Sequence, residues 1–296
     1  MTTLEIFIPF WGPPELFTQT VNSVLAQSDG DWRLTVLDDH YPDVAPGRWV
    51  ESLDDPRISY VRHPVNIGIT ENYREAVRRS TSDHLVLLGC DDLLHPNYVE
   101  VVKRVARAVP DADVIAPGVT VIDEHGHEIL PLADRVKQKI LTPRGAGIAV
   151  LRGERMATSL IRGDWLYWPA LAFRTQTLRA TPFRDGLPII QDLAVLMDIA
   201  FADGSLAFTP TTAFSYRRYG GSASQRTLVD GSRFRDERRF YRDAAEAADK
   251  RGWRRTARTA RLRILSRLHA ATEIPALLRH RSRAGLDSAL AHVFAP

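Results

Sequence analysis

Two pairs of adjacent aspartates are the residues whose type and spacing point most directly to chemistry. Asp38 and Asp39 follow one short apolar run, and Asp91 and Asp92 follow another. Adjacent carboxylates repel each other, and a hard divalent cation carrying a diphosphate would relieve that repulsion because it binds oxygen ligands. Asp38 and Asp39 could also accept hydrogen bonds from a nucleobase or a ribose. The simpler alternatives are a helix cap and a solvated turn.

A further carboxylate, Asp192, follows Gln191 at the start of a helical pattern. It could act as a general base that takes a proton from a hydroxyl group. The simpler alternative is a helix cap, since the macrodipole stabilises a carboxylate at a helix N-terminus. We expect the same dipole to lower the pKa of Asp192 and so to weaken it as a base.

Three other segments could contact a ligand. The run Asn66-Ile67-Gly68 could bring its backbone close to a ligand, or form a plain turn. Arg217 and Arg218, in the segment from Tyr216 to Ser222, could hold phosphate oxygens, or lie in a solvated hairpin turn. Trp165 and Trp168 could form a platform for a sugar or an apolar acceptor, or pack in the core.

Short apolar runs alternate with helical patterns over the first 120 residues. We expect strands at 4–10, 33–37, 57–61, 84–88 and 114–122, and helices at 14–27, 69–79 and 96–108. This alternation predicts a mostly parallel sheet with helices on both faces. Right-handed crossovers place the C-terminal ends of parallel strands at one edge, where ligands bind. The two aspartate pairs should therefore lie at that edge.

The remainder of the chain has weaker patterns. Residues 123–163 are rich in glycine and proline and are predicted to be irregular. Residues 192–202 are expected to form a helix, and residues 206–216 a strand. From Phe234 onward the sequence predicts two or three arginine-rich amphipathic helices.

Composition excludes several classes of protein. The 296 residues are 44% hydrophobic and 25% charged, as in soluble globular proteins. Cys90 is the single cysteine, so neither an intramolecular disulfide nor a cysteine-based zinc site can form. A glycine-rich dinucleotide fingerprint and a phosphate-binding P-loop are both absent. Without a membrane-length apolar run or a basic leader, we expect a cytoplasmic protein, with peripheral contact to the inner face of the membrane as an alternative.

Charge is distributed unevenly along the chain. Residues 233–296 hold 16 basic and 7 acidic residues, a net charge of +9, whereas residues 1–232 carry −6. Nucleic acid is not an expected partner, because no aromatic residues are interleaved with these arginines to stack on bases. The basic tail could instead cap the fold, form a homodimer contact or lie on an anionic membrane.

Taken in order, these segments resemble the family 2 glycosyltransferases, inverting enzymes with the GT-A fold. The resemblance covers about residues 4–225. Its matching segments are Ile6–Phe10, Ser23–Ser28, Leu34–Asp39, Asn66–Gly68, Asp91-Asp92 with Pro96, Gln191-Asp192, and Tyr216–Arg218 with Gly220–Ser222. It implies a Rossmann-like α/β fold with a nucleotide-sugar-binding half at 1–125 and an acceptor-binding, catalytic half at 126–232. An arginine-rich helical extension, residues 233–296, would follow.

The resemblance also implies roles for individual residues. The residues expected to line the nucleotide pocket are Pro9, Phe10, Asp39 and Asn66. Asp91 would contact the ribose or the donor sugar, and Asp92 would bind Mn²⁺ or Mg²⁺.

The resemblance places Asp192 at the catalytic base, and Trp165 and Trp168 on the acceptor side. Arg217 and Arg218 are the candidates for contact with the diphosphate. Three positions depart from the family pattern: Gly89 stands where an aspartate is common, Gln191 where a glutamate is common, and Tyr219 in place of a histidine. These departures leave the third metal ligand unassigned.

The resulting hypothesis is an inverting, metal-assisted transferase with Asp192 as general base. Its donor would be a UDP-, GDP- or dTDP-linked sugar, and its acceptor a hydroxyl of a sugar, a lipid-linked compound or a small molecule. A sugar nucleotidyltransferase is an alternative, although the chain lacks the glycine-rich, lysine-containing loop that such an enzyme needs. A catalytically inactive nucleotide-sugar-binding protein is a second alternative, in which Gly89 and Tyr219 would mark the lost activity.

Overall fold

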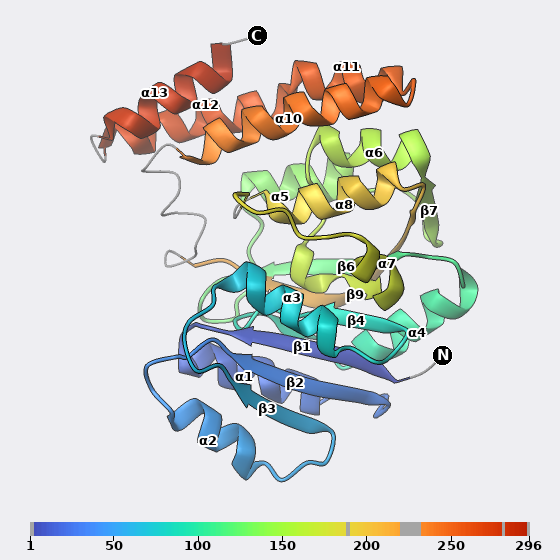
Figure 1. Ribbon diagram of the computed structural model, residues 1–296, viewed down its shortest axis with the longest axis vertical. Helices are drawn as coiled ribbons and strands as arrows, with labels where there is room; N and C mark the ends of the chain where they lie inside the picture. Colours follow the sequence, from blue (N-terminus) through green and yellow to red (C-terminus); the bar gives the residue numbers. More distant parts are fainter. Residues whose placement is uncertain (1–2, 188–189, 220–231, 280–281, 295–296) are drawn as a thin grey trace.

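The computed structural model describes residues 3–187, 190–219, 232–279 and 282–294. Figure 1 shows a sheet in the lower half of the molecule and a layer of helices at the top. The strand order is β3-β2-β1-β4-β8-β6-β9-β5, and β7 also pairs with β9. The strands of the first half run parallel, and their bounds are β1 Leu4–Phe10, β2 Trp32–Asp38, β3 Ile58–Arg62 and β4 His84–Leu87.

Helices cover both faces of this parallel half, as the alternation predicts. On one face, apolar side chains of β1 and β2 form a core with three helices, α1 Pro14–Leu25, α2 Ala45–Ser52 and α4 Tyr98–Ala108. On the other face, Phe7 and Leu37 join a second core, to which α3 Ile69–Arg79 and α8 Gln191–Phe201 contribute. Successive strand residues point to opposite faces, so a strand buried on both sides appears in the sequence as a continuous apolar run.

The second half of the sheet is mixed rather than parallel. β6 Val114–Ile122 and β9 Ser205–Arg217 run parallel to each other. Three short strands run antiparallel to their neighbours: β5 Leu93–Leu94, β7 Ala149–Arg152 and β8 Ala172–Arg174. The predicted mostly parallel sheet is therefore confirmed for β1–β4 and for the β6–β9 pair. Short strands such as β8 have too few residues to show a periodic pattern, and the sequence did not predict them.

The prediction that residues 123–163 are irregular is wrong. This segment contains α5 Leu132–Val136, a π-helical turn Lys137–Leu141, β7 and α6 Gly153–Arg162. The buried face of α6 consists of Met156, Ala157, Leu160 and Ile161, which have helical spacing. Glycines at both ends, Gly153 and Gly163, bound this short helix and obscure its pattern in the sequence. Two further helices were not predicted, α2 and α7 Thr175–Ala180, the second of which follows β8.

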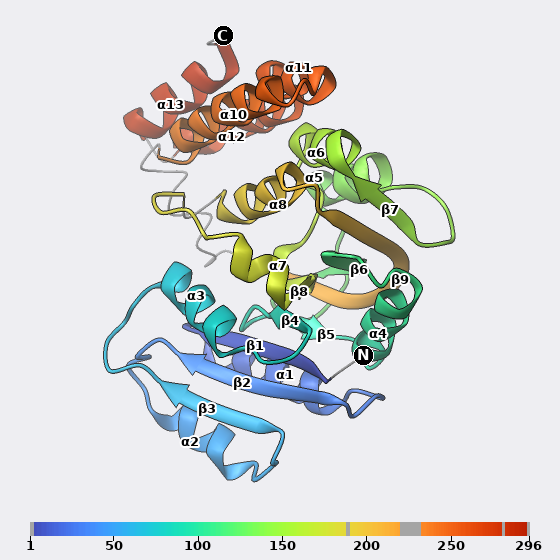
Figure 2. The same ribbon diagram turned by 45° about the vertical axis from the view of Figure 1, so that its right-hand side comes forward.

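The C-terminal segment is helical, as expected, but the described residues form four helices rather than two or three. They are α10 Ser232–Lys250, α11 Arg254–Leu262, α12 Ile264–Arg279 and α13 Arg283–Phe294. Figures 1 and 2 show them as a layer beyond α6 and α8, on the side away from β1–β3. Phe240, Tyr241 and Ala260 are buried in the same core as α6 and α8. The extension therefore packs onto the fold through α10 and α11.

Candidate functional site

The two aspartate pairs lie at the C-terminal ends of β2 and β4, as expected, but their members have different surroundings. Asp38 is fully buried and accepts a hydrogen bond from the Tyr41 backbone N–H at 2.7 Å. It also pairs with Arg62 at 2.6 Å and accepts a hydrogen bond from the Tyr60 hydroxyl. These contacts use both carboxylate oxygens, so Asp38 anchors the edge of the sheet.

Asp39 holds the loop that was expected to approach the nucleotide. Its two carboxylate oxygens accept the backbone N–H groups of Ile67 at 2.6 Å and of Gly68 at 2.9 Å. Gly68 has φ of 80°, a conformation that favours glycine. Asn66 precedes these residues and is exposed. The structure thus brings Asp39 and Asn66 together at the edge.

Pro9 and Phe10, at the end of β1, lie beside Asp39. The Phe10 carbonyl accepts the Asp39 backbone N–H at 3.1 Å. The Phe10 ring is fully buried and stacks on Phe17, with ring centroids 4.1 Å apart. Any ligand contact by Phe10 must therefore come from its backbone.

Asp91 and Asp92 form a pair of like charges in which Asp92 is buried and Asp91 is partly buried. Burial raises the pKa of both carboxyls, and the charge of Asp91 raises the pKa of Asp92 further. The pair is held by Arg217, whose backbone N–H donates to Asp92 Oδ1 at 2.8 Å and whose Nε donates to the Asp91 carbonyl at 2.7 Å. The Tyr219 hydroxyl hydrogen-bonds the Asp91 carboxyl.

This packing gives a reason for Gly89. A Cβ atom at this position would lie 2.5 Å from Asp92 Oδ2 and 3.1 Å from Asp91 Oδ1. A larger residue would therefore require the pair to move.

The two arginines that were candidates for diphosphate contact differ in availability. Arg217 is 3% exposed, and each of its guanidinium nitrogens donates to a protein oxygen: Nε to Asp91, Nη1 to the Asp123 and Glu124 carbonyls, and Nη2 to Gln19. The side chain of Arg218 is 38% exposed and lines a cavity. Arg218 is therefore the better placed of the two to contact a ligand.

A cavity of about 290 Å³ lies at the N-terminus of α8. Its lining includes three of the residues expected to be functional, Trp168, Asp192 and Arg218. Gln191 and Tyr216, which belong to the matching segments, also line it. The remaining lining residues were not given a role from the sequence, namely Ile69, Tyr73, Lys137, Asp164, Leu166, Tyr167 and Pro169. The cavity collects side chains from α3, the π-helical turn, the loop before β8, α8 and β9.

The carboxyl of Asp192 has a pKa raised to about 7, first by burial and then by the negative charge of Asp164. The Leu193 backbone N–H donates to its Oδ1 at 2.7 Å, and Lys137 lowers the pKa, but both effects are smaller than that of burial. The expectation that the helix dipole would leave a weak base is therefore wrong. A carboxyl with a pKa near 7 is well matched to proton transfer at neutral pH.

Asp164 is the main residue that sequence reasoning missed in this cavity. Burial raises the pKa of its carboxyl. Its Oδ1 atom is buried and has no hydrogen-bond partner within the described residues. In the sequence it is a lone aspartate between Gly163 and Trp165, with no pattern to indicate its proximity to Asp192.

A buried network holds Arg218 at the cavity. Asp134 is fully buried, and its two oxygens accept Arg218 Nε at 2.7 Å and Nη2 at 2.9 Å. The Tyr167 hydroxyl also donates to Asp134, at 2.9 Å, and Gln138 donates to Tyr167 at 3.3 Å. Asp134 therefore fixes the orientation of the guanidinium that faces the cavity.

We expect Asp134→Asn to lower the free energy of unfolding by about 3 kcal/mol, the lower end of the range for a broken buried ion pair, because Arg218 is partly exposed. The matched control is Asp198→Asn, which breaks a two-pronged pair with Arg184 nearer the surface. That control should lose no more than about 1 kcal/mol. Urea denaturation of both variants measures the difference, and equal losses would contradict a special role for Asp134.

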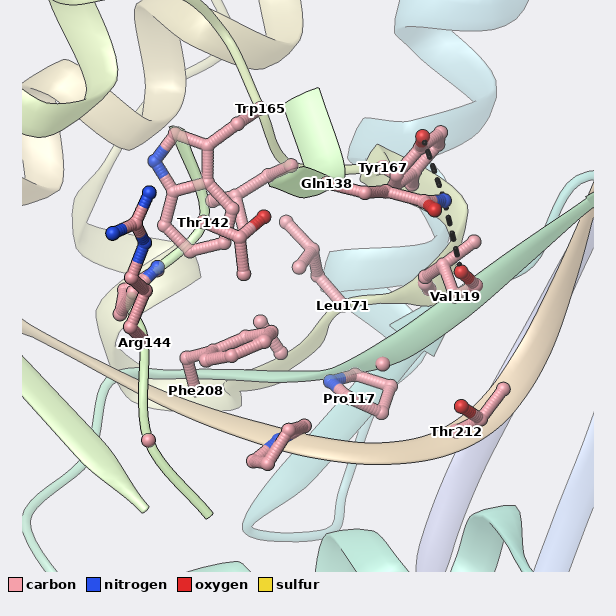
Figure 3. A pocket seen from close by; sticks show the side chains of 17 residues that line it. Pro117, Val119, Gln138, Thr142, Arg144, Trp165, Tyr167, Leu171, Phe208 and Thr212 are labelled. Carbon is pink, nitrogen blue, oxygen red and sulfur yellow. Dashed lines mark hydrogen bonds between the residues drawn. The ribbon is translucent and has the colours of Figure 1, made fainter. Parts of the chain in front are cut away.

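The two tryptophans expected on the acceptor side line different cavities. Trp168 lines the cavity of Asp192 and packs against Tyr73, with ring centroids 5.9 Å apart. Trp165 lines a second cavity of about 350 Å³, where its ring meets Phe208 edge-on at 5.5 Å (Figure 3). Trp165 is 2% exposed and Trp168 is 7% exposed, so packing accounts for most of the surface of both side chains. The two cavities share Leu166 and Tyr167.

Three further observations bear on the site. The predicted motif Gly220–Ser222 lies outside the described residues. Within the described part of the chain, no three acidic, histidine or cysteine side chains are grouped so that they could hold a metal ion by themselves. None of the helices, as far as they are described, combines the length and the apolar character that a membrane span requires.

The sequence matches a known family over more than half its length. Residues 5–160 match the model of the family described as glycosyl transferase family 2. The putative colanic acid biosynthesis glycosyl transferase WcaA of Escherichia coli is 26% identical over 99 residues, which is 33% of this chain and 36% of WcaA. The uncharacterized protein y4gI of Sinorhizobium fredii is 31% identical over 115 residues, 38% of this chain and 13% of that protein. The matches thus span only a minor part of either relative.

Solved structures share the fold. S. aureus TarS 1-349 superimposes with a TM-score of 0.69 at 11% sequence identity, covering 99% of this chain and 81% of that one. TarS 1-349 in complex with UDP-GlcNAc gives a TM-score of 0.69 at 12% identity, covering 99% of this chain and 82% of that one. At this identity the likeness shows a common GT-A-like α/β fold that includes the C-terminal helices.

Proposed function

The chain belongs to glycosyltransferase family 2, and on that basis we propose that it transfers a sugar from a nucleoside diphosphate sugar to an acceptor hydroxyl. One observation carries the proposal: a carboxyl with a pKa raised to about 7, that of Asp192, lines a cavity at the edge of the sheet. A nucleotide-sugar donor is supported by the similar fold of TarS 1-349 in complex with UDP-GlcNAc. Family membership sets aside the alternative of a sugar nucleotidyltransferase.

The donor would bind along the edge formed by β1, β2 and β4. The loop that Asp39 holds through two backbone N–H groups, with Asn66 exposed beside it, would contact the nucleoside. The backbone at Pro9 and Phe10 borders the same place, and Asp91 would contact the ribose or the sugar. Arg218 would donate to the diphosphate, because its guanidinium faces the cavity and is fixed by Asp134.

A divalent cation fits the Asp91–Asp92 pair. Asp92 is buried and Asp91 is partly buried, and the pKa of both carboxyls stays raised although the charge of Arg217 lowers it. Arg217 thus offsets the negative charge of the pair only in part, and oxygen donors are what Mg²⁺ or Mn²⁺ prefers. Nucleotide-bound cations are commonly held by one or two carboxylates together with phosphate oxygens, so a larger protein cage is unnecessary. Asp92 would hold the cation, which supplies positive charge to offset the charge that builds on the leaving diphosphate.

Asp192 would act on the acceptor. The acceptor oxygen forms a bond to the anomeric carbon while the bond from that carbon to the diphosphate oxygen breaks. The acceptor proton passes to the Asp192 carboxylate, which must therefore be ionised at the start. Attack from the face opposite the diphosphate inverts the anomeric configuration in one displacement.

The acceptor would enter over Trp168. Tyr73, Lys137 and Trp168 line the same cavity as Asp192 and could fix the orientation of the attacked hydroxyl. The second cavity, with Trp165, would receive a further part of the acceptor, since it shares Leu166 and Tyr167 with the first.

Thermal denaturation with nucleoside diphosphates tests the donor site. We expect one of UDP, GDP and dTDP, with Mn²⁺, to raise the melting temperature, because a ligand at 100 times its Kd stabilises the native state by about 2.7 kcal/mol. Asp92→Asn should abolish the part that depends on Mn²⁺ without lowering the melting temperature of the free protein, since it removes a repelled buried charge.

The control for this measurement is Asp287→Asn on the exposed side of α13, which should leave the ligand-dependent shift unchanged. If none of the three nucleotides stabilises the protein, the proposed donor site is wrong. Donor binding without transfer or donor hydrolysis would favour the inactive nucleotide-sugar-binding protein.

A further inference from the structure

The solvent side of α12 is apolar. Its exposed positions Ile264, Leu268, Ala271, Pro275 and Leu278 recur every three or four residues and so form one stripe along the helix. Ile264 is 59% exposed, Leu268 58% and Leu278 57%. The opposite side of the helix, with Ser266, Ala270 and Leu277, is buried. Among the residues that the structure describes, the stripe therefore takes little part in packing.

The stripe has apolar neighbours and basic flanks. Leu290 and Phe294 on α13 are 37% and 76% exposed, and α12 packs against α13. Exposed arginines adjoin these helices in the sequence: Arg258 and Arg261 on α11, Arg279 at the end of α12 and Arg283 at the start of α13. None of the exposed residues of α12 is acidic. Arg261 pairs with Asp249, whereas Arg258 and Arg283 form no ion pair with any residue that the structure describes.

These features together identify the chemistry of a partner. Burying the exposed apolar side chains of the stripe against an apolar partner would remove them from water, which is favourable. The arginines beside it favour a partner with negative charge, and they would repel a second copy of the same basic surface across a symmetric contact. Nucleic acid offers negative charge but no apolar layer for leucine and isoleucine side chains. An anionic bilayer offers both, with head groups for the arginines and acyl chains for the apolar stripe.

We propose that α12, with the adjoining end of α13, is a docking surface for an anionic lipid bilayer. The surface lies on the C-terminal layer of helices, on the side of the molecule away from β1–β3 (Figures 1 and 2). It uses none of the residues assigned to donor, cation or base. The proposal therefore stands or falls independently of the catalytic chemistry.

Flotation of the full chain with lipid vesicles tests the proposal. We expect the protein to float with vesicles of equal parts phosphatidylcholine and phosphatidylglycerol, and not with phosphatidylcholine alone. About 0.5 M NaCl should weaken this binding, because the Debye length then falls well below 10 Å. Absence of flotation with the mixed vesicles at low salt would overturn the proposal.

Paired variants locate the surface. The double variant Leu268→Glu and Leu278→Glu should reduce vesicle binding at least tenfold. Its matched control, Val44→Glu with Leu132→Glu, adds the same charge at exposed apolar positions elsewhere and should bind like the parent. All four positions are exposed, so both variants should fold, which far-ultraviolet circular dichroism checks. Equal binding by the two double variants would contradict the assignment.

Light scattering distinguishes membrane docking from a contact between two copies of the chain. The proposal requires that the full chain binds the mixed vesicles and that Leu268→Glu with Leu278→Glu leaves its molar mass unchanged. If the parent is an oligomer that this variant dissociates, and the parent ignores vesicles, the face is a contact between copies and the membrane proposal fails.

Discussion

Asp192→Asn is expected to lower kcat by about 10²- to 10⁴-fold and to change the KM for the donor little. The asparagine amide keeps the shape of the carboxylate and can still receive the Leu193 backbone N–H, but it cannot take a proton from the acceptor. Release of the nucleoside diphosphate under steady-state conditions measures the loss. Turnover within about threefold of the parent would remove Asp192 from the mechanism.

The same helix provides the control for this experiment. Asp198 also lies on α8 but pairs with Arg184, away from the cavity lining. The Asp198→Asn variant should therefore retain full turnover.

The stability of the Asp192→Asn variant gives a second measurement. Because the pKa of Asp192 in the folded protein lies above its ordinary value of 3.8, ionising this carboxyl costs stability as the pH rises toward 7. At pH 8 the Asp192→Asn variant should therefore melt at a higher temperature than the parent. This is the usual trade-off in which a charge required for activity lowers stability.

The parts of the fold that the sequence predicted are those with a long periodic pattern. β1 and β2 are buried on both faces and show continuous apolar runs, and α4 places Val99, Val102 and Val105 on one side. The aspartates that end β2 and β4 could be assigned to one edge because parallel strands must point the same way. In contrast, α6 is bounded by glycines and β8 has three residues, so their patterns were too short to recognise.

The site was predicted where strand order brings residues together. Asp39 and the loop after β3 fall into this class, because both follow parallel strands that end at one edge of the sheet. Asp134 and Asp164 do not, since each is a lone aspartate whose partner, Arg218 or Asp192, lies far along the chain. The same limit applies to Arg217 and Arg218, which are adjacent and identical in type. Only packing shows that one is enclosed by protein oxygens and that the other faces a cavity.

The pKa of Asp192 could not be judged from the sequence. Helix position alone argues for a lowered pKa. Burial and Asp164 outweigh that effect, and both depend on segments that the sequence places far from α8. The charged and titratable groups that face Asp192 come from four elements: Tyr73 on α3, Lys137 on the π-helical turn, Asp164 on the loop before β8, and Tyr216 and Arg218 on or just after β9.

The pH dependence of the reaction follows from this arrangement. Because the base must be ionised and its pKa is about 7, kcat should fall tenfold for each pH unit below 7, and about 100-fold by pH 5. Asp164→Asn removes a negative charge that raises this pKa, so the fall should move to lower pH by roughly one unit. The variant should therefore be more active than the parent, relative to its own plateau, at pH 5 to 6.

Lys137→Met supplies the opposite test, because the charge of Lys137 lowers the pKa of Asp192. In that variant the fall in kcat should move to higher pH. If the pH of half-maximal kcat falls in one variant and rises in the other, a general loosening of the fold is excluded. Such loosening would shift this pH in the same direction in both variants, or would lower the maximal kcat without shifting it. If this pH shifts in neither variant, the group that titrates is not Asp192. The proton would then go to another residue, and the donor site would be judged separately by the expected nucleotide-dependent rise in melting temperature.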